Sequence, residues 1–280
     1  AALLAIGVWA YWGTLLEMVQ TWDREPDYSH GYLILPVALY FLWARRESFP
    51  GWSSGVIWAG LCLIGLSISM RYVAGLLFLG AVDGWSMIPW IAGAVWLLCG
   101  TRVLFWSTPS ILFLLLMVPM PYRAERMLSV PLQSIATKLS TWTLQLLGQP
   151  AFAEGNVILL GEHRLQVEEA CSGLRIFMGI IALAFAYVVV TRRTWWERLL
   201  LILAILPIAL IANSTRIVAT GLLYQFVSGE AAQTFSHDLA GWVMIPFAAL
   251  LFAVCLGYLG LLYREEETVD ATSLVRRAAT

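Results

Sequence analysis

Three side chains in this sequence combine into one possible chemistry: Cys171, Arg216 and His237. Cys171 lies in the polar run 167–175, directly before the apolar segment 176–190. At the N-terminus of a helix, unpaired backbone N–H groups and the helix dipole favour the thiolate form of a cysteine. A thiolate can attack a peptide carbonyl, a histidine can carry the proton to the leaving amine, and an arginine can hold an oxyanion or a carboxylate. The three residue types therefore suit acyl transfer through a thioester.

The other three cysteines lack such surroundings. Cys62, Cys99 and Cys255 lie among Leu, Ile and Val, where cysteine behaves as a small hydrophobic residue. Four cysteines without a repeated spacing indicate neither a disulfide framework nor a metal site. The sequence also contains no His-Glu-x-x-His zinc motif and no Gly-x-Ser-x-Gly motif. We therefore expect no metal and no cofactor.

The composition predicts a polytopic membrane protein. Hydrophobic residues make up 60% of the 280 residues and charged residues 12%, whereas a soluble domain has about 45–50% and about 25%. Several apolar runs approach the ~20 residues that span a bilayer. The net charge of -1, without a large basic cluster, argues against nucleic acid as a partner. We expect about eight transmembrane helices, near residues 1–20, 31–44, 54–70, 84–100, 103–119, 172–190, 197–226 and 238–263. The stretch 71–83 could extend the third of them.

The arginines predict how these spans are oriented. When the eight spans are threaded in order, most arginines near span ends fall on one side, which the positive-inside rule makes cytoplasmic. Both termini and the polar tail 264–280 are then cytoplasmic, and Arg71 is a mild exception. The arginines on the common side are Arg45, Arg46, Arg102, Arg192, Arg193, Arg198, Arg264, Arg276 and Arg277.

The same arginines give the depth of the three candidate catalytic residues. Cys171, Arg216 and His237 lie 21, 18 and 27 residues from the nearest cytoplasmic arginine of their own span. At ~1.5 Å per helical residue these separations are about 32, 27 and 40 Å. The hydrocarbon of a bilayer is ~30 Å thick. We therefore expect the three side chains to meet near the outer surface, on three successive spans.

The long stretch 120–170 between the fifth and sixth spans is then extracytoplasmic. Residues 123–147 have apolar positions at helical spacing and a polar face, which suits a helix lying on the outer surface. Residues 157–160 and 164–167 are two short strand-like segments on either side of Gly161-Glu162. They predict a β-hairpin that leads to Cys171. The predicted fold is an all-α polytopic membrane protein with a short extracytoplasmic amphipathic helix and a β-hairpin between spans five and six.

Four sequence blocks resemble the exosortase/archaeosortase family. They run in the family's order from about residue 23 to 245, and the resemblance implies an integral membrane domain over 1–263 that acts as a cysteine protease/transpeptidase of the bacterial inner membrane. The blocks are Asp27-Tyr-Ser-His-Gly-Tyr-Leu33, Glu169-Ala-Cys-Ser-Gly-Leu-Arg175, Asn213-Ser-Thr-Arg216 and His237-Asp-Leu-Ala-Gly241.

The resemblance also implies partners and roles. The substrates are expected to be exported proteins with a C-terminal sorting signal: a Pro-Glu-Pro-like motif, a transmembrane helix and a basic tail. Such families accompany exopolysaccharide gene clusters, and the cleaved protein passes to a surface acceptor on the periplasmic side. Cys171 matches the nucleophile, Arg216 the essential arginine and His237 the third position. Archaeal relatives have arginine at that third position, which leaves open whether His237 acts as a base.

Four further residues are candidates for supporting or substrate-binding roles: Arg175, Asn213, Glu169 and His30. Arg175 lies one turn after Cys171 and could hold a substrate carboxylate or support the thiolate; a structural pair with Glu168 or Glu169 is an equal alternative. Asn213 lies one turn before Arg216 and could orient it by a hydrogen bond.

His30 lies at the mouth of the second span, and three roles are open for it: a direct chemical role, capping of the helix, or packing in the loop. Two other functions remain open for the whole chain. One is a membrane-edge cysteine protease with water as the acceptor. The other is a non-enzymatic component of polysaccharide export or assembly, which predicts polar residues at several depths along the spans.

Overall fold

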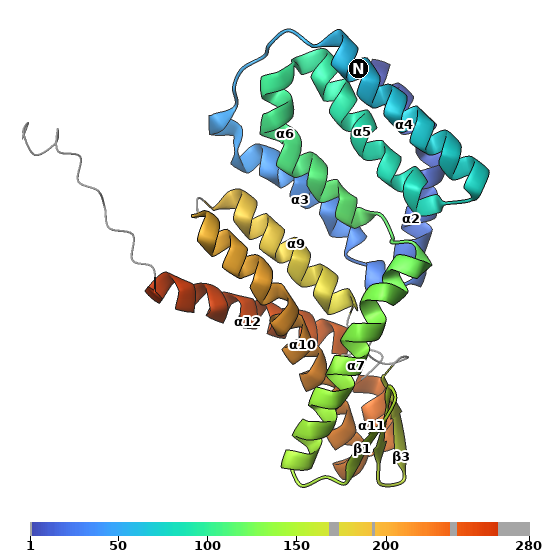
Figure 1. Ribbon diagram of the computed structural model, residues 1–280, viewed down its shortest axis with the longest axis vertical. Coiled ribbons are helices and arrows are strands. Elements are labelled where there is room, and N and C mark those ends of the chain that lie inside the picture. Colours follow the sequence, from blue (N-terminus) through green and yellow to red (C-terminus); the bar gives the residue numbers. More distant parts are fainter. Residues whose placement is uncertain (1, 168–173, 192–193, 236–239, 263–280) are drawn as a thin grey trace, which may run out of the picture.

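The computed structural model describes residues 2–167, 174–191, 194–235 and 240–262 (Figure 1). Most of the described residues are helical, and short 3-10 helices connect some of the α-helices: η1 (Pro26–Tyr28), η2 (Arg46–Ser48) and η3 (Leu114–Met117). The α-helices are α1 (Ala2–Ala10), α2 (Trp12–Arg24), α3 (Gly31–Ala44), α4 (Ile57–Leu77), α5 (Gly80–Cys99), α6 (Thr101–Phe113), α7 (Tyr122–Leu146), α9 (Leu174–Val190), α10 (Trp195–Phe226), α11 (Gly229–Thr234) and α12 (Ala240–Leu262).

Within the described residues, four helices are long and apolar enough to cross a membrane. They are α4, α5, α10 and the part Val243–Leu261 of α12. A fifth candidate is the bent pair Thr101–Met117 and Tyr122–Leu146, in which the helices differ in direction by 84°. These helices agree with an all-α membrane protein, but the predicted eight spans are not confirmed.

The difference arises where predicted spans give short helices. The N-terminal apolar run is broken at Tyr11 into helices of 9 and 13 residues, and α3 and α9 have 14 and 17 residues. At ~1.5 Å per residue, α3 is only about 21 Å long, which is less than the ~30 Å of bilayer hydrocarbon. Apolar content predicts that a segment is buried in the membrane, but it does not reveal where the helix breaks.

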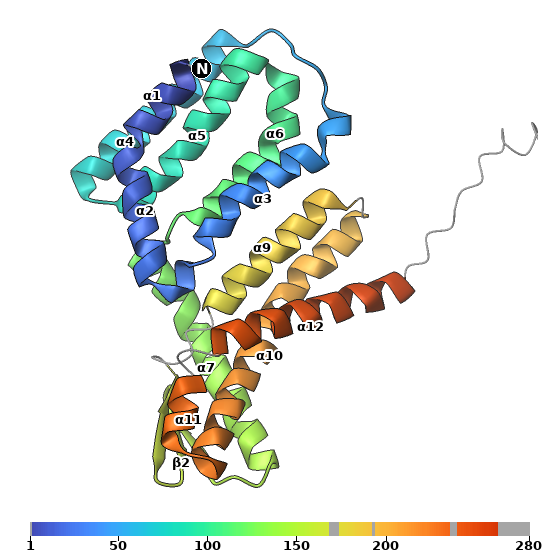
Figure 2. The same cartoon turned by 180° about the vertical axis from the view of Figure 1, so that it is seen from behind.

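Several helix ends that carry arginines lie together at one end of the bundle. Arg45, at the end of α3, donates from Nη1 to the carbonyl of Trp106 in α6 at 2.7 Å. Ser53, before α4, donates to the carbonyl of Cys99 at the end of α5 at 2.9 Å. The end of α9 and the beginning of α10 lie on the same side (Figures 1 and 2). This arrangement is compatible with the threading predicted from the arginines.

Helices α4 and α5 pack closely because glycines face each other in their interface. A Cβ added at Gly60 would lie 2.6 Å from Cβ of Leu97 and 2.9 Å from the carbonyl oxygen of Gly93. Small residues at such positions let two membrane helices approach until their backbones touch. The pair α4–α5 therefore forms a tight two-helix unit.

Gly60→Ala is expected to lower the free energy of unfolding by about 1–3 kcal/mol, because the added methyl group has no space. Gly65→Ala on the same helix is the matched control, since nothing lies within 4 Å of its added Cβ. Thermal unfolding in detergent measures both variants. Equal midpoints for the two variants would contradict this packing.

Residues 151–166 form a three-stranded antiparallel sheet in the order β1 (Ala151–Glu154), β2 (Val157–Leu160) and β3 (His163–Gln166). Strands β2 and β3 pair with Leu160 opposite His163, around a turn in which Gly161 has a φ of 61°. The sequence predicts only these last two strands. Strand β1 was missed because Ala-Phe-Ala-Glu contains no β-branched residue and only one aromatic residue.

Helix α7 packs along the C-terminal half of α10. Ser140 donates to the carbonyl of Ser214 at 3.3 Å, and Leu144 lies against Gly221. The later residue of α7 contacts the later residue of α10, so the two helices run in the same direction. The buried side of α7, which includes Ser140, is mostly small and polar, whereas the apolar residues Met127, Ile135, Leu139 and Trp142 are exposed. Helix α7 therefore contacts α10 through its small and polar face, and its apolar face remains open. Together with the sheet, these helix segments form a lobe at one end of the molecule (Figure 1), with a core of Ala136, Leu144, Ala151, Ile158, Leu160, Leu165, Val167, Ile217 and Val218.

Candidate functional site

Four of the seven predicted site residues are described by the structure: His30, Arg175, Asn213 and Arg216. Cys171, Glu169 and His237 lie outside the described residues. Of the described four, Arg175 is the nearest to Cys171 in the sequence, and its helix, α9, begins three residues after Cys171.

Arg175 in the first turn of α9 forms an ion pair with Asp27 of η1. Its Nε lies 3.5 Å from Oδ1 of Asp27, and the two side chains are about one quarter exposed, at 24% and 26%. Such a partly exposed pair contributes at most about 1 kcal/mol to stability, but it fixes where the two segments meet. The sequence suggests Glu168 or Glu169 as ion partners, and both lie outside the described residues. The pair instead joins the first sequence block to the second.

Tyr28 is buried beside this ion pair, with 5% of its surface exposed. Its hydroxyl donates to Oε2 of Glu125 in α7 at 3.2 Å. Burial, followed by the negative charge of Glu125, raises the pKa of Tyr28 far above its usual value. The phenol therefore stays protonated, and it donates its proton in the hydrogen bond to Glu125. This hydrogen bond holds α7 against η1.

His30 contacts two backbone carbonyls. Its Nδ1 lies 3.0 Å from the carbonyl oxygen of Asp27, and its Nε2 lies 3.2 Å from that of Leu116. Burial lowers the pKa of His30, and the two carbonyls oppose this effect in part. The neutral ring can donate to only one of the carbonyls. The side chain makes no cap hydrogen bond to α3, so of the three predicted roles the geometry favours packing in the loop.

The lowered pKa of His30 predicts a pH-dependent stability. The unfolded chain binds the proton more readily than the folded chain, so stability is complete above the usual pKa of 6.5 and falls as the pH decreases through the folded value. Thermal unfolding midpoints are expected to decrease between about pH 7 and 5. His30→Gln is expected to make this decrease shallower. An unchanged slope in that variant would assign the effect to other groups.

Asn213 and Arg216 lie one turn apart on α10, but the predicted hydrogen bond between them is absent. Asn213 is 2% exposed, and neither Nδ2 nor Oδ1 of its carboxamide has a hydrogen-bond partner among the described residues. Leaving a buried amide unpaired costs about 1–3 kcal/mol per group. Asn213 is therefore a buried polar group with donor and acceptor capacity for a substrate or for the segments outside the described residues.

One site contact was not foreseen from the sequence. Glu125 lies on a polar helix face with arginines on either side, where an acidic residue is ordinarily solvated. Only its hydrogen bond with Tyr28 distinguishes it. For the part of the chain that the structure describes, no group of three His, Cys, Asp or Glu side chains is arranged to hold a metal ion.

Comparison with known proteins places these residues in one family. The family model for transmembrane exosortases (Exosortase_EpsH) matches residues 22–254, more than four fifths of the chain and all seven predicted site residues. No curated protein and no solved structure matches the chain.

Proposed function

The chain belongs to the transmembrane exosortase family, a family of membrane sorting enzymes, and from this premise we propose that it is a cysteine transpeptidase. It cleaves the C-terminal sorting signal of exported proteins at a Pro-Glu-Pro-like motif that precedes a transmembrane helix and a basic tail. The protein portion is then transferred to a surface acceptor. The enzyme lies in the inner membrane with both termini in the cytoplasm, and its site faces the periplasm.

One observation supports this proposal most directly: the ion pair between Asp27 and Arg175. It brings the first family block to the beginning of α9, only four residues after Cys171 in the sequence. Blocks that are far apart in the chain are expected to converge in this way if they build a single reaction site.

The proposed reaction has two steps. In the first, Sγ of Cys171 attacks the scissile carbonyl carbon, a C–S bond forms and the C–N bond breaks. His237 accepts the thiol proton and delivers it to the departing amine. In the second, an amine of the acceptor attacks the thioester, the C–S bond breaks and the proton lost by the amine returns to the cysteine sulfur through His237. Arg216 stabilises the oxyanion that develops in both steps.

The described residues have supporting roles in this scheme. Because Arg175 is already paired with Asp27, we assign it to positioning the start of α9 rather than to catalysis. Asn213 supplies a buried carboxamide one turn from Arg216. The apolar substrate helix docks laterally among the spans, and this remote binding positions the scissile bond.

The proposal is tested with the purified protein in proteoliposomes, a sorting-signal substrate and an added primary amine. Mass spectrometry of the new substrate C-terminus is expected to show an amide with the amine. A free carboxylate as the sole product would exclude transfer and leave the membrane-edge protease. No cleavage, despite correct insertion of both proteins, would contradict the enzymatic proposal.

Asp27→Asn is expected to lower kcat/KM by about tenfold, because a weakened pair with Arg175 allows the start of α9 to shift. Asp23→Asn is the matched control: Asp23 also accepts a side-chain hydrogen bond, from exposed Tyr32, but the ion pair seen with Arg175 is made by Asp27. Initial rates of substrate cleavage measure both variants. Equal rates for the two variants would remove the positioning role of Asp27.

A further inference from the structure

Arg71 is a charged residue within an apolar helix, and the proposed reaction does not use it. It lies six residues before the end of α4 at Leu77, about 9 Å from that end along the helix axis. Its Nε lies 3.6 Å from Oδ1 of Asp83 in α5, and its guanidinium lies 4.5 Å from the ring centroid of Tyr11. An arginine inside a membrane helix is costly and indicates a functional site.

A polar network from three helical segments holds this guanidinium. The hydroxyl of Tyr11 hydrogen-bonds Ser67 at 2.7 Å and Ser86 at 2.9 Å. The carboxylate of Asp83 accepts a hydrogen bond from Thr14 at its Oδ2, in addition to its ion pair with Arg71. The arginine therefore has a fixed position without a ligand. Its Nη1 is buried and has no hydrogen-bond partner among the described residues.

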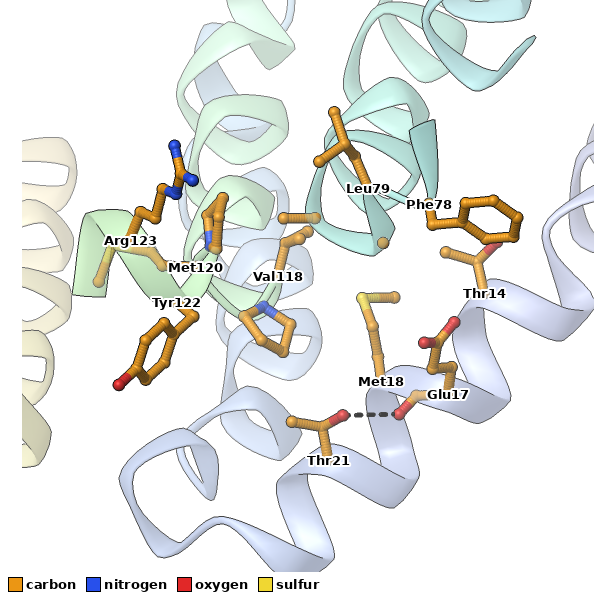
Figure 3. A pocket seen from close by; sticks show the side chains of 14 residues that line it. Thr14, Glu17, Met18, Thr21, Phe78, Leu79, Val118, Met120, Tyr122 and Arg123 are labelled. Atoms are coloured by element: carbon orange, nitrogen blue, oxygen red, sulfur yellow. Dashed lines mark hydrogen bonds between the residues drawn. The ribbon is translucent and has the colours of Figure 1, made fainter. Parts of the chain in front are cut away.

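Two adjoining cavities lie beside this network. One, of about 450 Å³, is lined by the charged residues Arg71, Asp83 and Glu17. The other, of about 500 Å³, is mainly apolar and includes Met18 and Val118. The cavities share Glu17, Phe78, Leu79 and Gly80. Figure 3 shows the Glu17 and Met18 side chains of α2 on one side of the apolar cavity and Leu79 and Val118 opposite them.

Glu17 is the second charged group that is available to a ligand. It is exposed, its backbone carbonyl accepts a hydrogen bond from Thr21, and no described cation forms an ion pair with its carboxylate. The charged cavity is thus lined by Arg71, whose side chain is 36% exposed, and by Glu17, whose carboxylate has no ion pair among the described residues. Both cavities lie at the α4–α5 turn, near the end of the bundle where a lipid headgroup would reside.

We propose that the two cavities bind a membrane phospholipid with a primary-amine headgroup. The phosphate accepts hydrogen bonds from the guanidinium of Arg71, and the ammonium donates to the carboxylate of Glu17. The upper part of an acyl chain lies in the apolar cavity against Met18 and Val118. The cavity volumes are in the range of ~300–1,000 Å³ that is usual for small-molecule sites.

The charges of the site select this class of lipid. In the charged cavity one guanidinium faces two carboxylates, so a headgroup that carries only an anion is less favoured there than one that also carries a cation. Arg123 adds a second guanidinium only to the apolar cavity. A ligand without an anionic group leaves Arg71 with Asp83 as its only ion partner among the described residues. A quaternary ammonium cannot donate a hydrogen bond to Glu17 and prefers the face of an aromatic ring. The face of the nearby Tyr11 ring is already covered by Arg71. A phosphate joined to a primary ammonium pairs with both Arg71 and Glu17.

Native mass spectrometry of the full chain in detergent tests this site with three lipids of identical acyl chains: phosphatidylethanolamine, phosphatidylcholine and phosphatidylglycerol. Phosphatidylethanolamine is expected to bind about tenfold more tightly than the other two, as one charge-assisted hydrogen bond implies. Glu17→Gln is expected to remove this preference, and its exposed position favours normal folding. Glu47→Gln removes an exposed carboxylate from the opposite end of the bundle, and is expected to retain the preference.

Three results would overturn the site. They are equal binding of all three lipids by the unmodified chain, tighter binding of phosphatidylglycerol, and a preference that survives in Glu17→Gln. Arg71→Lys provides a second test, because it keeps the charge and removes the guanidinium. This variant is expected to bind phosphatidylethanolamine and phosphatidylcholine more weakly, and by the same factor. Unchanged binding of both lipids would exclude the phosphate contact.

Discussion

Cys171→Ala is expected to lower the rate of substrate cleavage by at least about 10³-fold, because no thioester forms without the sulfur nucleophile. The measurement is cleavage of the sorting-signal substrate in proteoliposomes. Cys171→Ser provides a second readout, since a hydroxyl at the same place has a far higher pKa and is expected to be almost as inactive. A thiol-reactive probe at neutral pH is expected to label Cys171 faster than any other cysteine.

The control for this prediction is a chain in which Cys62, Cys99 and Cys255 are all replaced by alanine. Cys62 is exposed and the other two are partly exposed, and all three lie in apolar helices outside the four sequence blocks. This variant is expected to keep its activity and its fast labelling. Retained activity in Cys171→Ala, or equal labelling of all four cysteines, would contradict the proposed nucleophile.

Arg216→Ala is expected to lower kcat/KM by about 10²–10³-fold, the usual cost of removing one group that stabilises an oxyanion. Arg216→Lys keeps the charge but loses the planar donor pair, and is expected to recover only part of the activity. The backbone carbonyl of residue 216 accepts a hydrogen bond from the hydroxyl of Thr220 at 2.9 Å, and this bond does not depend on the side chain at position 216. Helix α10 is therefore expected to remain intact in both variants.

Arg164→Ala serves as the matched control, because Arg164 is an exposed arginine on strand β3 of the same lobe. It is expected to leave kcat/KM unchanged. Unfolding midpoints measured alongside the rates separate a catalytic loss from a folding defect. If Arg216→Ala remained as active as Arg164→Ala, the oxyanion role would have to be assigned elsewhere, with Arg175 as the next candidate.

The long apolar helices were predictable from the local sequence. The places where a helix breaks or bends were not predictable in this way. The apolar runs that became α4, α5, α10 and α12 are recognisable from hydropathy alone. The break at Tyr11, the bend of 84° before α7 and the strand β1 leave no comparable signal. Hydropathy measures transfer into lipid, whereas these features depend on backbone angles and on neighbours from other segments.

Arg71 illustrates the same limit for a functional group. In the sequence it is only an exception to the positive-inside rule, at the edge of a predicted span that ends at residue 70. In the structure, α4 continues to Leu77, and Arg71 lies within the helix against Asp83 and Tyr11. The polar partners that make this arginine tolerable come from other helices, so no local pattern could indicate them.

By itself, the sequence determined the membrane class, the order of the family blocks and the residue types of the proposed site, because these are properties of consecutive residues. Only the tertiary structure decided which side chains meet. Asp27 reaches Arg175, and Tyr28 reaches Glu125 across 97 positions of the chain. These contacts depend on how η1, α7 and α9 pack against one another, and helix packing is set by side-chain shape over the whole bundle rather than by the spacing of residues along one segment.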